Sequence, residues 1–276
     1  MEVKSVAEQL YFTTVRIDTI DRKGETGSGT GFICVHDYRG NSYPFVVTNR
    51  HVVRNARKGG ITFLKKENEG PKLGDAFRVE NDNFPSLWHD HPDPAVDITI
   101  APLAPIEQFV NDRGIAVFYR SINTDMIPRG EELAELDALE EIVFVGYPIG
   151  IWDQENFTPV MRKGTTATPI CLNFEGQKKF LIDASVFVGS SGSPVFIYNR
   201  GAYATKTGEV KFGTRVLFVG VVTSVFHKDE LNEIVRAPVP TEDTPVVVGK
   251  EMIDLGIVFR SETVVEAIES AIDRAG

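Results

Sequence analysis

The chain has 276 residues, 42% of them hydrophobic and 25% charged, which is an ordinary composition for one globular unit near the upper size of a single core. Its formal net charge of −10 and pI of about 5.1 argue against a nucleic-acid-binding protein, which usually carries a basic face. No apolar run approaches the roughly 18 residues of a membrane span, and the first eight residues lack an apolar segment. We therefore expect neither a membrane protein nor a signal peptide.

The first half of the chain has the patterns of a β-protein that opens with a short helix over 1–10. Apolar alternation predicts strands over 11–18, 30–35 and 43–48, and His51 follows the third. Further strands are predicted over 61–64 and 77–79, with a charged loop over 65–75 between them. A histidine at a strand end is well placed for function, because the strand holds it in position.

The loop before Asp97 contains His89, Asp90 and His91, a combination that could bind zinc. Pro92 and Pro94 indicate an irregular loop, and no third ligand follows at a suitable spacing. We therefore predict no metal site and no cofactor. The loop is expected to deliver Asp97 to the start of the next strand.

The second half begins with a linker and insertion over 104–130 and a helical turn over 131–141, followed by a second set of strands. These strands are predicted over 142–146, 160–168, 180–188, 195–198, 216–225 and 254–260. The polar, proline-containing segment 227–250 is expected to form a long loop beside a cleft. A capping-box pattern at Thr263 and an apolar stripe from Val264 to Ile272 predict a final helix.

The segment Gly189–Pro194 separates two apolar runs and has the pattern Gly-x-Ser-Gly. Such a turn can expose Ser191 while the backbone N–H groups of Gly189 and Ser191 converge where an oxyanion forms in acyl transfer. A serine hydroxyl needs a base, and the base needs an orienting group. His51 and Asp97 are the candidates, so the order along the chain is His, Asp, Ser.

Five segments in this order carry a family resemblance: 29–33, 48–53, 93–98, 143–150 and 183–194. They resemble chymotrypsin-fold (trypsin-like) serine proteases, with motifs closest to the high-temperature-requirement type. The resemblance implies one peptidase domain over 1–276. It would be all-β, with two packed six-stranded antiparallel β-barrels over about 10–105 and 141–260 and a C-terminal α-helix over 261–276. The stretch after Val225 is too short for a PDZ domain as well.

The implied function is a serine endopeptidase that forms an acyl-enzyme through His51, Asp97 and Ser191. By the same resemblance, Ser185 lies at the base of the specificity pocket, where a small uncharged residue favours an apolar or aromatic substrate side chain. Val222, Thr223 and Ser224 would pair with the backbone of a protein or peptide substrate.

Two departures from the family pattern, Ser190 and Ser193, keep an alternative open: a latent peptide-binding or regulatory module that needs an activating partner. Ser193 in particular adds a side chain beside the oxyanion loop, where it could restrain turnover. An α/β-hydrolase esterase is disfavoured, because the triad order and the absence of βα alternation both contradict it.

The two cysteines, Cys34 and Cys171, lie in apolar surroundings, and we expect both to be buried and reduced. Unpaired thiols suit a reducing compartment, so the expected location is the cytoplasm.

Overall fold

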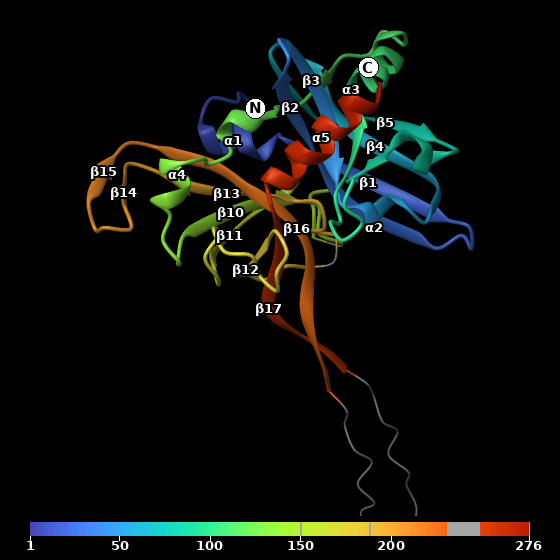
Figure 1. Cartoon of the computed structure of the whole chain (residues 1–276). Helices are drawn as coiled ribbons and strands as arrows, with labels where there is room; N and C mark the ends of the chain where they lie inside the picture. The colour runs from blue at the N-terminus through green and yellow to red at the C-terminus, as the bar shows by residue number, and fades with distance from the viewer. Residues whose placement is uncertain (150, 188, 231–248, 276) are drawn as a thin grey trace, which may run out of the picture.

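A computed structural model of the protein describes residues 1–149, 151–187, 189–230 and 249–275. An N-terminal sheet and a C-terminal barrel lie side by side, and the last helix lies across their junction (Figure 1). The all-β class and the C-terminal helix predicted from the sequence are confirmed.

The N-terminal half is a sheet of nine strands that starts after the helix α1 (Val6–Tyr11). Its order is β5-β4-β1-β2-β3-β7-β6, with β8 paired to β4 and β9 paired to β2. The strands are β1 (Thr14–Asp21), β2 (Thr26–Tyr38), β3 (Asn41–Thr48), β4 (Ala56–Glu67), β5 (Gly70–Asn81), β6 (His89–Asp90), β7 (Thr99–Pro102), β8 (Val117–Phe118) and β9 (Ile122–Asn123). The six strands predicted for a closed barrel are thus joined by short additional ones, and the hydrogen-bonded order has two ends.

Two predictions for this half are wrong in detail. Residues 65–75 are not a loop, because β4 and β5 continue as one hairpin that turns near Asn68. Their charged side chains pair across the strands, as Lys65 and Asp75 do at 2.7 Å. Residues 104–130 are not a bare linker, since they contain most of α3 (Leu103–Asn111), the strands β8 and β9 and the 3-10 turn η2 (Thr124–Met126).

The C-terminal half is a closed barrel of six strands in the order β10-β11-β12-β17-β16-β13, as predicted. The strands are β10 (Glu141–Gly146), β11 (Val160–Thr166), β12 (Lys179–Asp183), β13 (Pro194–Asn199), β16 (Arg215–Glu230) and β17 (Gly249–Arg260). The hairpin β14 (Ala202–Ala204) and β15 (Val210–Phe212) stands beside it, and α4 (Glu131–Ala134) is a single turn. The strands β16 and β17 run on beyond the barrel as a paired ribbon (Figure 1), so the ends of the predicted loop 227–250 are strand, and its middle, 231–248, lies outside the described residues.

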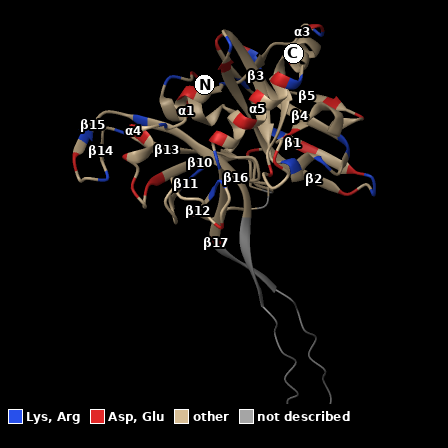
Figure 2. Ribbon diagram, in the orientation of Figure 1, with Lys and Arg blue, Asp and Glu red and all other residues tan. Residues whose placement is uncertain are grey.

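One apolar cluster joins the two halves. Phe32 of β2 packs edge-on against Phe218 of β16, with ring centroids 5.4 Å apart. The helix α5 (Glu262–Ala275) adds Val264, Ala267 and Ile268 to the same cluster. Figure 2 shows acidic residues along the length of this helix. The halves therefore form one packed unit rather than two independent ones.

The cysteine prediction is half right. Cys34 is buried in β2, and burial raises the pKa of its thiol to about 12. Cys171 is exposed, because it lies in the irregular segment between β11 and β12, and both thiols are free. Within the described residues, no helix is long and apolar enough to cross a lipid bilayer.

Candidate active site

His51 lies on α2 (Arg50–Val53), a single helical turn directly after β3. Asn49 and Arg50, the two residues before His51, hold this turn in place. Buried Asn49 donates from Nδ2 to the backbone oxygen of Asp97 at 2.9 Å. The backbone N–H of Arg50 reaches the same oxygen at 3.3 Å. The loop that carries Asp97 is thus bonded to the turn that carries His51.

The Asp97 carboxylate forms two hydrogen bonds with His51. Its Oδ1 accepts the backbone N–H of His51 at 3.0 Å, and its Oδ2 lies 2.5 Å from His51 Nδ1. A third donor, Thr223 Oγ1 from β16, reaches Oδ2 at 2.8 Å. Because Nδ1 faces a carboxylate, the arrangement assigns the proton to Nδ1 and leaves Nε2 as the basic nitrogen.

The ionisation of Asp97 follows from these contacts. Burial by itself raises the pKa of the carboxyl, but hydrogen bonds from His51 and Thr223 and the charge interaction with His51 outweigh it. The net pKa of Asp97 is lowered, so the group is an anion at neutral pH. A fixed anion at Nδ1 stabilises an imidazolium that forms when Nε2 takes up a proton.

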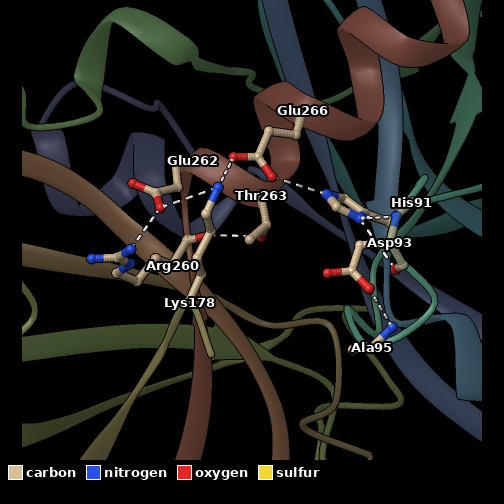
Figure 3. A network of polar contacts seen from close by, with 8 residues as sticks. All are labelled: His91, Asp93, Ala95, Lys178, Arg260, Glu262, Thr263 and Glu266. Carbon is tan, nitrogen blue, oxygen red and sulfur yellow. Dashed lines mark hydrogen bonds and ion pairs between the residues drawn. The ribbon is translucent and has the colours of Figure 1, made fainter. Parts of the chain in front are cut away.

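The loop before Asp97 is anchored from behind by the C-terminal helix (Figure 3). His91 is buried, and its Nδ1 accepts the backbone N–H of Asp93 at 3.0 Å. Its Nε2 is therefore the protonated nitrogen, and it donates to Glu266 of α5 at 3.3 Å. Glu266 also pairs with Lys178, next to β12, so one carboxylate links the Asp97 loop, the last helix and the barrel.

The loop Gly189–Pro194 is held in shape by backbone hydrogen bonds. Gly189 has φ +92°, and the N–H of the next residue, Ser190, donates to the backbone oxygen of Phe187 at 2.9 Å. A positive φ of this size is a backbone conformation that glycine adopts without the steric cost of a Cβ. Gly192 has φ +88°, and a Cβ there would lie 1.9 Å from the backbone oxygen of Thr30. Both glycines are thus required by backbone geometry.

Thr30 of β2 ties this loop to the N-terminal sheet, a role that the sequence analysis missed. Its N–H donates to the oxygen of Ser191 at 2.9 Å, and its hydroxyl donates to the oxygen of Gly189 at 3.0 Å. The same hydroxyl accepts the N–H of Tyr147 at 2.9 Å. The resemblance marked residues 29–33 as a family segment, but nothing in the sequence identified this hydroxyl as the contact.

Ser191 and His51 line one cavity of about 310 Å³, together with Gly189 and the β1–β2 hairpin. The hydroxyl of Ser191 donates to the backbone oxygen of Thr223 at 3.2 Å. Among the described residues, it makes no hydrogen bond to His51, and the N–H groups of Gly189 and Ser191 have no partner. The candidate nucleophile, the candidate base and the loop residue Gly189 therefore line one opening.

The four residues predicted to bind substrate have different environments. Ser185 is half-buried and is not among the residues that line the cavity at Ser191. The backbone of Val222 is bonded on both sides to the loop, since its N–H reaches Ser193 and its oxygen accepts from Gly192. Thr223 is bonded to Asp97, and only Ser224 is exposed.

Ser193 points away from the cavity. It is fully buried, its hydroxyl has no partner within the described part of the chain, and a Cβ on Gly146 would lie 2.1 Å from that hydroxyl. It fills space beside the strand β10. Nothing in this position links it to the opening in which Ser191 lies.

The His89–His91 loop has no metal-binding arrangement. His91 is committed to Asp93 and Glu266, and no group of three or more metal-ligating side chains gathers among the described residues.

The family model of the trypsin-like peptidase domain matches residues 29–202, more than half of the chain and the whole stretch from Thr30 to Ser193. The chain belongs to this family. No curated protein sequence matches this trypsin-like peptidase, but solved structures resemble it at low sequence identity.

Three of these structures are proteases. The active form of a Mycobacterium tuberculosis protease is 17% identical, with 96% of this chain and 82% of that chain covered and a TM-score of 0.47. An HtrA-type protease with a bound tripeptide is 12% identical, with 100% and 65% covered and a TM-score of 0.49. A thermostable serine protease from an extremophilic microorganism is 14% identical, with 94% and 97% covered and a TM-score of 0.44. Because all three are distant, the family assignment rests on the sequence match.

Proposed function

We propose that this trypsin-like peptidase is a serine endopeptidase whose nucleophile is Ser191. The observation that carries the proposal is the shared cavity, which is lined by Ser191, by Gly189 and by the His51 that Asp97 orients. In the first step, Ser191 Oγ forms a bond to the scissile carbonyl carbon and His51 Nε2 takes the hydroxyl proton. The carbonyl oxygen becomes an oxyanion beside the N–H groups of Gly189 and Ser191.

The later steps use the same groups. Collapse of the tetrahedral intermediate breaks the peptide C–N bond, and His51 gives its proton to the departing amine. Water then attacks the Ser191 ester, with His51 again taking a proton, which returns to Ser191 as the acid product leaves. Asp97 stays ionised throughout, as its lowered pKa requires.

The peptide that enters this site is proposed to pair with the backbone at Thr223 and at the exposed Ser224. Val222 is a poor candidate, because its own N–H and oxygen are already bonded. Ser185 remains a proposed specificity residue. Since Cys34 and Cys171 are both free thiols, a cytoplasmic location remains our prediction.

The test is covalent labelling with an uncharged fluorophosphonate, read by intact mass, on the wild type and on Ser191→Ala. One adduct on the wild type and none on the variant supports an activated Ser191. Peptidase activity should fall by about 10⁴-fold or more in the variant. A labelled Ser191→Ala protein would place the nucleophile elsewhere.

One observation favours a second candidate, a latent peptide-binding module. Ser191 donates to Thr223 rather than to His51, so the nucleophile and base are not yet in contact. Catalytic hydrogen bonds often tighten only when substrate binds, which keeps the endopeptidase as the first proposal. Binding of an extended peptide without any labelling of Ser191 would favour the latent module and a search for an activating protein.

A further inference from the structure

A second cavity, of about 620 Å³, adjoins the one that holds His51 and Ser191. The two cavities share Asp21, Asn55 and Ala56 as lining residues, so they lie next to each other. The second cavity lies between the turn that joins β1 to β2 and the connection from α2 to β4.

Four cations line this second cavity: Arg22, Lys23, Arg54 and Arg57. All four are exposed, and none of them forms an ion pair with any residue that the structure describes. Figure 2 shows the basic tip of the β1–β2 hairpin that carries two of them.

The acidic residues of the cavity are already engaged. Asp82 pairs with Lys58 at 2.5 Å, and Asp21 accepts the backbone N–H groups of Lys23 and Glu25, each at 2.8 Å. Glu25 lines the neighbouring cavity at Ser191. With four cations against the two carboxylates of Asp21 and Asp82, the second cavity carries a net positive charge on a chain whose net charge is −10, and such a field attracts anions.

The position of these cations relative to His51 indicates which side of the cleaved bond they contact. His51 donates its proton to the leaving amine, so the part of the peptide C-terminal to the cleaved bond must lie next to His51. The connection that follows His51 along the chain supplies Arg54 and Arg57 to the second cavity. The cations therefore face the residues on the C-terminal side of the cleaved bond.

We propose that this cavity binds acidic residues of the substrate, so that the protein acts on peptides with Asp or Glu C-terminal to the cleaved bond. This inference rests on the proposed endopeptidase function for its direction. The preference comes from several exposed ion pairs, each weak, which together discriminate by about tenfold at low salt. It declines as salt screens the charges.

The experiment compares two peptides that differ only by Asp-Glu or Asn-Gln after the cleavage position. Binding is measured by fluorescence anisotropy on Ser191→Ala protein, which needs no turnover. Cleavage is measured separately on protein with Ser191 intact. The test variant is R22Q/R57Q, with one cation removed from each wall. The matched control is R129Q/R200Q, which removes two exposed cations outside this cavity and leaves the same net charge.

We expect the acidic peptide to bind about tenfold more tightly than its amide counterpart. R22Q/R57Q, but not the control variant, should reduce this difference to about threefold, because Lys23 and Arg54 remain. Equal binding of the two peptides overturns the inference, as does an equal loss in both variants, which would indicate a general charge effect. Fluorophosphonate labelling separates the two claims. Labelling without acidic preference leaves the endopeptidase proposal standing, and acidic preference without labelling supports the cavity but not the chemistry.

Discussion

At the scale of single residues, the Asp97 carboxylate depends on a donor from the other half of the molecule. Thr223→Val keeps the shape of this buried side chain but removes the hydroxyl that reaches Oδ2 at 2.8 Å. A hydrogen bond to a charged group contributes about 1.5 kcal/mol or more, so kcat should fall about tenfold with little change in KM. Thr223→Ser should retain most of the activity, and a rate equal to wild type in Thr223→Val would contradict this role.

A pair of glycines with the same backbone conformation tests the nucleophile loop. Gly192 and Gly201 both have φ +88°, but a Cβ on Gly201 meets nothing within 4 Å, whereas one on Gly192 meets Thr30. Gly201→Ala should cost only the intrinsic penalty of about 1–2 kcal/mol. Gly192→Ala should lower the free energy of unfolding by at least about 2 kcal/mol more and abolish activity. Chemical denaturation of the two variants provides the comparison, and equal losses would show that the close approach to Thr30 is unimportant.

At the scale of elements, the helix α5 makes two similar contacts with different consequences. Glu266 accepts from His91 in the Asp97 loop, while Glu269 lies 3.3 Å from His36, on the strand β2. Replacing either glutamate by alanine should lower the free energy of unfolding by about 1 kcal/mol. Only Glu266→Ala should also reduce kcat, by about tenfold, because only His91 supports the loop that carries Asp97 (Figure 3). The discriminating measurement is kcat beside the melting temperature for Glu266→Ala and Glu269→Ala. Equal rates in the two variants would contradict a positioning role.

At the scale of the whole molecule, the shared core should make the two halves unfold together. Phe218 of the barrel is fully buried against Phe32 of the sheet, and its replacement by Ala should cost about 3–5 kcal/mol. Trp88 reports on the N-terminal half, since it packs against Phe84. Unfolding is followed in a Trp152→Phe background by the emission of Trp88 and by far-UV circular dichroism. Phe218→Ala should lower the unfolding midpoint by the same amount with both signals. Separate transitions would indicate halves that fold independently.

The sequence by itself determined the class of the fold, the family and the candidate site residues. Alternating apolar runs predicted the barrel strands, because side chains in a strand alternate between faces. Glycine occurs at positions 189 and 192 around Ser191 because both positions have a positive φ. Short-range signals of this kind are readable because backbone conformation depends on neighbouring residues.

Only the tertiary structure decided which residues meet. Thr30 is far from Ser191 along the chain, Thr223 is far from Asp97, and Glu266 is far from His91. Nothing in the local sequence of these residues indicates that they form hydrogen bonds with one another. The hairpin over 65–75 was missed because paired charges on exposed strands resemble a polar loop. The basic cavity beside His51 combines a turn and a helix end that only folding brings together. Contacts between distant segments depend on how the sheet and the barrel pack, and that packing is a property of the whole chain.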